Sequence, residues 1–343
     1  MVKIPNVYDN EAFSAIELTQ QINEIAFQGT QLRDLLPVSV TNATTSDIAI
    51  EKSANGIAVI DAAPRGSAGA EIGLAKKSSF KLTVPHYPVS TSINANEMRE
   101  ALQSVGQAGE LVGIRALHER YMTNWAQVSF PQLWERGLGG ALDGIIRSSS
   151  GVEEISLRDL YGDAPQEIEV DYTDADFDWI TTLEEAKAAA RKRLGGFAAV
   201  RDWTLLMFGE AAKSVRSNKK LAATKERIDP AFLSADRIKN SSRTRFSDDV
   251  ELFTYQSTPG FADPVVFDDV DAGGCMLVPI VPGLIDCTFT PTETIDGVNG
   301  PGLPLYADVP EEYATKRGYK LTAESNFLFT VKRLGALMKF VQA

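Results

Sequence analysis

The sequence predicts an α+β protein of extended shape, and three observations support this prediction. Apolar residues recur at spacings of three and four from about residue 107 to 147, which indicates one apolar face of a long helix. Two stretches before it, 45–61 and 80–93, alternate in polarity and are rich in β-branched residues, as strands are. Strand and helix patterns then mix over residues 153–283, which indicates a separate α+β domain.

The length and composition are those of a large globular chain. With 343 residues the chain exceeds one typical domain and can bury a sizeable core, and its 44% hydrophobic and 23% charged content is ordinary for a soluble protein. No apolar run approaches the roughly 20 residues needed to cross a membrane. The start, Met1 to Pro5, lacks the apolar core of a signal peptide. We therefore expect no membrane partner and a cytoplasmic location.

The long helical stretch would extend roughly 50–60 Å at about 1.5 Å per residue, which suits an extended molecule better than a compact enzyme. Pro131 lacks the N–H needed for an i→i−4 hydrogen bond. It therefore either kinks the stretch or opens a second helix capped by Ser129. The expected apolar face consists of Ile114, Leu117, Tyr121, Trp125, Val128, Trp134, Leu138, Ala141 and Ile145.

The segments before this helix need a partner to pack on. Residues 1–45, with a helix around 15–27, have no core of their own and read as an arm. The two strands that follow enclose the Gly/Ala-rich segment 62–73 and predict a long β-hairpin. A two-stranded hairpin is marginal alone in water, so it requires the body of the protein or another subunit.

The rest of the chain supplies the α+β domain and the returning strands. Acids after Thr181 or Thr182 predict a capping box for the helix over 183–194. The stretch 319–341 is expected to return beside the long helix. The further expected elements are strands at 168–170, 198–206, 252–255, 275–281 and 286–291 and a helix at 208–217.

The charges are segregated along the chain. The formal net charge of −12 argues against general nucleic-acid binding, which needs a positive field. Residues 153–185 hold twelve acids and one base, whereas residues 213–245 hold ten bases and three acids. Either stretch alone is typical of a solvated face, but the two can also meet between copies of the chain.

The cysteines and histidines predict neither a metal site nor a cofactor. Cys275 and Cys287 lie in apolar surroundings, and a reducing compartment would keep them as thiols. The only histidines are His86 and His118, and neither has a Cys or His neighbour at ligand spacing. We expect His86 to lie in a strand and His118 to face outward among its charged neighbours.

The acids between residues 174 and 185 match a calcium-binding loop only in part. Asp174, Asp176, Asp178 and Glu185 occupy its positions 1, 3, 5 and 12, but Trp179 stands where the sharp turn needs glycine. Acids just before a helix interact favourably with its N-terminal dipole, which explains them without a metal.

No signature of catalysis is present. Gly137, Gly139, Gly140 and Gly144 follow no strand and precede no Lys-Ser/Thr pair, so close packing against the helix explains them better than phosphate binding. A nucleophile elbow, a zinc-protease motif and a Walker loop are all missing from the sequence. Because acids are plentiful, a cytoplasmic enzyme with a carboxylate site within 153–283 stays open as an alternative.

Four local motifs occur in a fixed order. They are Ala62-Ala63-Pro64-Arg65-Gly66, the Gly-Ala-Leu-Asp-Gly end of the long helix at 140–144, Val298 to Ala307, and Glu324-Ser325-Asn326-Phe327-Leu328. Together with the order arm, hairpin, helix, mixed domain and returning strands, they resemble the major capsid proteins of tailed bacteriophages. More narrowly, they resemble the lambda-type major capsid protein E family. Phe327 and Leu334 stand where that family usually has proline, which concerns only local strand geometry.

The resemblance implies the shell-forming fold shared by tailed phages and herpesviruses. Its parts would be an N-arm (1–45), an extended loop (46–93), a peripheral domain (94–152 with 284–343) and an axial domain (153–283). The implied function is structural and not enzymatic. The protein would be a coat protein that self-assembles through hexamers and pentamers, in the host cytoplasm, into the icosahedral head shell of the virion.

The resemblance also implies partners. Portal and scaffolding proteins are expected, a decoration protein is a further candidate, and packaged DNA would be near the shell only through non-specific proximity. A decoration or tail protein is the alternative within phage structures, but it would be shorter, β-rich and without the long helix. The residues proposed for contacts between subunits are Arg65, Lys76, Lys77, Lys219, Lys220, Asp174, Asp176 and Asp178.

Overall fold

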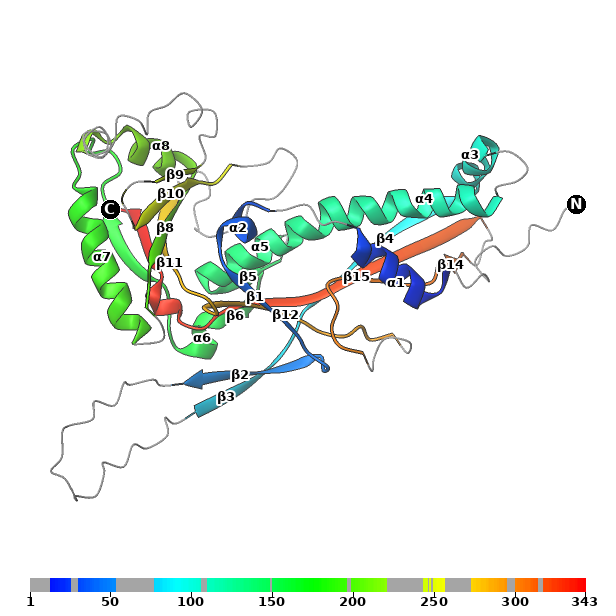
Figure 1. The fold of residues 1–343 in the computed structure, drawn as a ribbon, viewed down its shortest axis with the longest axis horizontal. Helices are drawn as coiled ribbons and strands as arrows, with labels where there is room; N and C mark the ends of the chain where they lie inside the picture. Colours follow the sequence, from blue (N-terminus) through cyan, green and yellow to red (C-terminus); the bar gives the residue numbers. More distant parts are fainter. Residues whose placement is uncertain are drawn as a thin grey trace, which may run out of the picture.

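The computed structural model describes residues 13–25, 30–53, 77–105, 110–148, 150–195, 199–220, 243–245, 247, 249–256, 273–294, 300–313 and 317–343. Figure 1 shows an elongated molecule, in which a long helix and long strands run side by side and a compact module of sheet and helices closes one end. A two-stranded hairpin projects from the middle, away from the long helix. The predicted α+β class is confirmed.

The long helix is continuous but not uniform. It consists of α4 (Glu110–Asn124), a π-helical turn η3 (Trp125–Ser129) and α5 (Phe130–Asp143), and we call it the spine. The Phe130 N–H donates to the Trp125 carbonyl, five residues back, just before Pro131. This wider π-helical turn accommodates Pro131, which has no N–H to donate within the helix. Of the two alternatives at Pro131, the second helix capped by Ser129 is wrong, because Ser129 is itself helical and its side chain makes no capping hydrogen bond.

The spine also ends earlier than predicted. Gly144 takes a φ of 82°, in the left-handed region that glycine enters without strain, and its N–H closes onto the Ala141 carbonyl at 3.2 Å. Ile145 was expected on the helix but begins the short strand β5 (Ile145–Arg147). Ile145 continues the helical spacing by coincidence, because in β5 it is half-buried and its neighbour Ile146 is the residue buried in the core.

A six-stranded sheet lies along the spine and forms its main support. β15 (Gly318–Val331) is the central strand, and α5 packs against it, as predicted for the returning stretch. The neighbouring strands pair in the order β1-β12-β15-β13, while β4 and β14 pair with β15 as well. Their bounds are β1 (Val38–Asn42), β4 (His86–Asn94), β12 (Ile285–Phe289), β13 (Tyr306–Ala307) and β14 (Glu311–Glu312).

The projecting hairpin consists of β2 (Asp47–Ser53) and β3 (Lys77–Thr83), paired antiparallel. The sequence predicted one strand over 80–93, but the chain divides it at Val84-Pro85 and sends β4 into the main sheet. Proline is suited to this break because it cannot donate to a strand ladder. The Gly/Ala-rich segment 62–73 lies outside the described residues.

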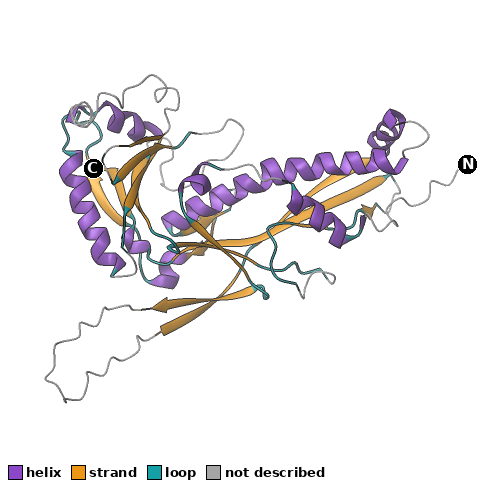
Figure 2. Cartoon of the chain, viewed as in Figure 1, coloured by secondary structure: helices purple, strands orange, loops and turns teal. Residues whose placement is uncertain are grey.

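The compact module is a second six-stranded sheet, in the order β7-β16-β11-β8-β10-β9. Helices α7 (Trp179–Leu194) and α8 (Gly209–Ser217) pack on one face of it around a separate apolar core, and Figure 2 shows them beside the sheet. The strands are β7 (Gln166–Val170), β8 (Asp202–Phe208), β9 (Arg243–Arg245), β10 (Val250–Thr254), β11 (Gly274–Ile280) and β16 (Met338–Gln342).

The last strand, β16, lies outside the sheet that the sequence predicts for it. Residues 284–343 are predicted to pack with the spine, but β16 pairs with β7 and β11 in the compact module. The chain crosses between the sheets through a 3-10 turn, η5 (Leu334–Ala336). Both sheets therefore depend on the C-terminal segment.

The described part of the arm packs on the chain's own body. Helix α1 (Ala15–Glu24) lies against β13, α2 (Gln31–Leu35) lies against α5, and β1 joins the main sheet. The arm was expected to need support from outside itself, and its described residues find that support on their own chain. The remaining described elements are α3 (Ala95–Val105), β6 (Glu153–Ser156) and α6 (Leu157–Tyr161).

Both cysteines are buried free thiols, as expected from their apolar surroundings. Burial raises the pKa of Cys275 and of Cys287 to about 12, so both stay protonated and unreactive at neutral pH.

Candidate assembly surfaces

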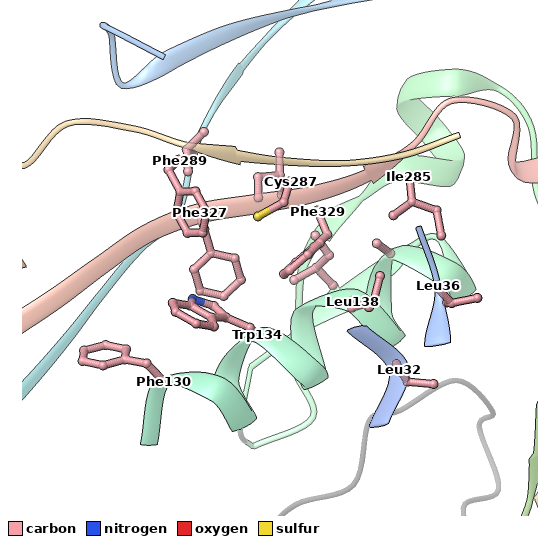
Figure 3. Packing of buried hydrophobic residues seen from close by; sticks show 14 of the residues in the cluster. Leu32, Leu36, Phe130, Trp134, Leu138, Ile285, Cys287, Phe289, Phe327 and Phe329 are labelled. Carbon is pink, nitrogen blue, oxygen red and sulfur yellow. The ribbon is translucent and has the colours of Figure 1, made fainter. Parts of the chain in front are cut away.

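The spine meets the main sheet through aromatic rings. The indole N–H of Trp134 donates to Ser325 Oγ at 3.1 Å, and its ring lies edge-on to Phe289 at 6.0 Å. Figure 3 shows Trp134 and Leu138 of the spine facing Phe327 and Phe329 of β15. The close approach depends on Gly137, because a Cβ there would lie 2.8 Å from Phe327. The prediction that the glycines serve close packing is confirmed at this position.

Replacing Gly137 by alanine is therefore expected to destabilise the chain. The overpacking costs about 1–3 kcal/mol, partly offset by alanine's helix preference of about 1 kcal/mol. Chemical denaturation of Gly137→Ala, Phe327→Leu and the double variant measures the coupling between the two positions. A favourable coupling of about 1 kcal/mol or more is expected. Strict additivity would contradict the packing argument.

One buried carboxylate joins the spine to the compact module. Asp143, the last residue of the spine, is 0% exposed and accepts hydrogen bonds from three cations. Arg147 of β5 lies at 3.0 Å, Arg158 of α6 at 2.5 Å and Lys339 of β16 at 2.9 Å. Lys339 is itself buried, and this cluster, which we call the junction, links the end of the spine to the sheet of the compact module.

The arm is held to the spine by another buried acid. Glu135 of α5 accepts the backbone N–H of Leu32 at 2.9 Å, which satisfies a donor at the start of α2. Burial raises the pKa of Glu135, and the hydrogen bonds from α2 oppose that rise. Helix α1 is fixed separately, because Asn23 Nδ2 donates to the Leu305 carbonyl at 2.7 Å.

A groove of about 440 Å³ opens between α1 and residues 292–294 and 300–308. Ile16 on α1 is 69% exposed at its edge, and Leu303 and Tyr306 line the facing wall. An exposed large apolar side chain beside such a groove marks a candidate contact with another protein surface.

The predicted contact residues fall into two groups. Arg65 and Lys76 lie outside the described residues, and Lys77 opens β3 opposite Ser53. The predicted contacts of Arg65, Lys76 and Lys77 with a neighbouring subunit therefore stay a prediction.

The acidic and basic contact residues lie together within one chain. Lys219 Nζ is 3.7 Å from Asp176 and Lys220 Nζ is 3.9 Å from Asp178, all exposed. Asp178 caps α7 by accepting the N–H of Thr181 at 3.2 Å, so the expected capping box on threonine is wrong. This hydrogen bond and Lys220 hold the pKa of Asp178 below its usual range.

One of the two histidines lies where the sequence predicts and the other does not. His86 lies in β4 as expected, but His118 is buried against the ring of Phe13 and does not face outward. Burial lowers the pKa of His118 to about 4, so it is neutral at physiological pH. Within the described residues, no group of acids, cysteines and histidines is arranged to hold a metal ion, and no helix has the length and apolarity to span a membrane.

Solved structures with the same fold are phage capsid proteins. The putative capsid protein of a prophage of E. coli CFT073 aligns with a TM-score of 0.56 at 12% identity, covering 96% of this chain and 99% of its own. The mature capsid of bacteriophage PhiM1 aligns at 0.52 and 8% identity, covering 93% and 88%. The capsid of Myoviridae phage XM1 aligns at 0.52 and 9%, covering 94% and 95%. The chain therefore has the fold of tailed-phage capsid proteins.

The family follows from the sequence itself. A model of the family "phage major capsid protein E" matches residues 14–342, and the chain belongs to that family. Its role is that of a structural coat protein whose copies assemble into the capsid of a virion. The predicted resemblance is confirmed. The long spine helix argues against the alternative of a decoration or tail protein, which would lack such a helix. A search of curated protein sequences gives no match.

Proposed function

We propose that this protein assembles through hexamers and pentamers, in the host cytoplasm, into the closed icosahedral head shell of a tailed phage. The observation that carries the proposal is the hairpin β2–β3, which leaves the body and projects from it (Figure 1). A two-stranded hairpin is marginal alone in water, so it gains stability by lying on a neighbouring copy. The described arm residues, 13–25 and 30–45, pack on their own body, which supports the hairpin as the element for exchange.

In this proposal the chain divides into four parts: the arm (1–45), the extended loop (46–93), the peripheral domain (94–152 with 284–343) and the axial domain (153–283). The axial domains would surround the five- and six-fold positions, with β16 contributed by residues 338–342. The exposed Ile16 groove supports a second contact between copies.

Further partners are part of the same proposal. A portal and a scaffolding protein would act in assembly, and a decoration protein would bind the finished shell. The net charge of −12 supports a shell that encloses DNA without binding it tightly. Electron microscopy of the purified chain tests the function directly, because closed shells or rings of five and six copies are expected. Monodisperse monomers under all assembly conditions would overturn the proposal.

The segregated charges supply a prediction about assembly. Exposed ion pairs contribute little to folding and are screened beyond about 8–10 Å at ordinary salt. Reversing Lys219 and Lys220 to glutamate should leave the subunit folded, although it removes contacts to Asp176 and Asp178 within the chain. If these runs also meet between copies, the variant assembles less and high salt weakens wild-type assembly in the same direction. Circular dichroism checks folding and light scattering checks assembly. Insensitivity to both changes would leave the runs as solvated faces.

A further inference from the structure

We propose that the sheet of the compact module continues from one copy to the next, through antiparallel pairing of β9 of one subunit with β7 of its neighbour. The two strands are the opposite edges of the six-stranded sheet, and neither pairs with another described strand on its outer side. An open strand edge presents unpaired N–H and C=O groups that another chain can bind. The inference rests on the proposed assembly of copies into rings, and it names the surfaces through which they meet.

The outward backbone groups of β7 belong to two exposed acids. The Gln166 N–H and the Val170 carbonyl bond to the C-terminal segment that contains β16, at 2.9 and 3.1 Å. Alternate residues of a strand bond to the same neighbouring strand, so the residues between them turn the other way. Glu167 and Glu169 therefore direct their N–H and C=O groups away from β16, and both residues are exposed.

The outward backbone groups of β9 belong to two arginines. The N–H of Tyr255, directly after β10, donates to β8 at 2.9 Å, so the odd-numbered residues of β10 face β8. The even-numbered Leu252 faces β9, where Thr244 is its partner. Arg243 and Arg245, on either side of Thr244, therefore direct their N–H and C=O groups away from β10.

The two edges also match in strand direction. The pairings across the sheet make β7 and β9 run in opposite directions. Copies arranged around an axis parallel to the strands keep the strand direction, so β9 of one copy meets β7 of the next as an antiparallel pair. The two edges of one sheet lie about 24 Å apart, at about 4.8 Å per strand. The contact is therefore head-to-tail, and such contacts generate closed rings.

The charged side chains lie on one face of the sheet. Ile168 of β7 and Leu252 of β10 turn toward the core beneath α7 and α8. Their neighbours Glu167 and Glu251 therefore turn to the other face. Arg245 lies opposite Glu251 and shares that face. Acid and arginine are thus on the same side when the sheets are joined.

Charge selects the head-to-tail contact and its register. The antiparallel register that places Glu167 opposite Arg245 also places Glu169 opposite Arg243. Opposite charges across an antiparallel pair are stabilising and like charges are destabilising. Two β7 edges would bring acid against acid and two β9 edges arginine against arginine, so neither edge pairs with itself. Arg245 also lies 3.4 Å from Asp202 of its own chain, and its guanidinium has five N–H donors, enough for both carboxylates.

Cysteine cross-linking of the purified chain tests the pairing. Opposed residues of a hydrogen-bonded antiparallel pair have Cα atoms about 5.5 Å apart, within the range of a disulfide. Glu167→Cys combined with Arg245→Cys should give, on mild oxidation, a ladder of covalent multimers up to five or six copies. Each single variant should give dimers at most. The matched control, Glu210→Cys with Arg245→Cys, should give no ladder, because Glu210 is exposed on α8, which packs on β8 and β11.

Two further variants report on the same seam. Glu169→Cys with Arg243→Cys tests the same register, and it serves as the test if the first pair does not fold. Glu169→Pro removes one outward N–H and leaves the bonds to β16 in place, since proline is tolerated at a strand edge. It should raise the protein concentration needed for assembly roughly three- to tenfold, as the loss of one hydrogen bond per contact does. Circular dichroism checks that each variant folds.

The outcomes separate the edge pairing from the proposed function. The absence of a ladder from both cysteine pairs overturns the edge pairing, and the charges then only protect free strand edges. Shells that form without a ladder leave the proposed function standing and contradict the edge pairing alone. A ladder without shells supports the edge pairing and contradicts only the assembly into a closed head.

Discussion

Replacing Asp143 by alanine is expected to destabilise the chain by about 3–5 kcal/mol, as removing one partner of a buried ion pair does. Arg147 and Arg158 are partly exposed and can turn toward water. The Lys339 side chain is 3% exposed, and without Asp143 its ammonium would be left buried next to the spine without this carboxylate. Urea denaturation measures the loss, and hydrogen exchange should show β16 opening first.

Two variants test whether the buried charge is the cause. Adding Lys339→Met to Asp143→Ala removes the uncompensated ammonium and should restore part of the lost stability, because a buried pair replaced by apolar groups is often near neutral. The control is Asp47→Asn, which breaks the exposed pair with Lys81 at 2.6 Å and should change stability little. A double variant less stable than Asp143→Ala alone would contradict this account.

The junction is also expected to affect assembly of the shell. It lies where the spine, β5, α6 and β16 meet, so it sets how the compact module is attached to the elongated half. Assembly at a fixed curvature requires that this attachment be the same in every copy. A loosened junction should therefore broaden the range of assembled particles before it prevents folding.

Sequence reasoning found the elements that obey a period and missed the contacts that cross the fold. The spine, β7, α8 and β11 follow from apolar spacing, because each is a local pattern. The end of the spine was misplaced because Ile145 continued the apolar spacing in a strand, while the glycine before it carried the stop signal. The destination of β16 could not be read at all, since strand pairing between distant segments leaves no local mark.

The missed polar residues did leave a weak signal. Asp143 and Lys339 are single charges inside apolar runs, and Glu135 lies on a buried helix face. An isolated charge in such a run is stable only with a buried partner, which predicts pairing without naming the partner. His118 shows the limit of neighbour-based reasoning, because the adjacent Glu119 and Arg120 turn outward while the imidazole turns in toward Phe13.

Removing the hairpin is expected to abolish shell formation while leaving the subunit folded. Residues 47–83 can be replaced by a two-residue Asn-Gly turn, because Ser46 and Val84 already face each other across a 3.0 Å hydrogen bond. Each strand of the hairpin pairs only with the other among the described residues, so neither sheet loses a member. The deletion also removes Ile48, Ile50 and Leu82, which pack partly buried against the main core, so we expect the shortened chain to stay folded with a lower thermal stability.

The shortened chain then separates the two sources of assembly energy. If the hairpin carries the contact between copies, gel filtration and electron microscopy should find monomers where the wild type gives shells. A matched control keeps the hairpin and replaces the exposed Ile16 of the groove by serine, which should weaken assembly without abolishing it. Shells formed by the shortened chain would show that the hairpin is dispensable. Loss of assembly in Ile16→Ser alone would instead place the main contact at the groove between α1 and residues 292–294 and 300–308.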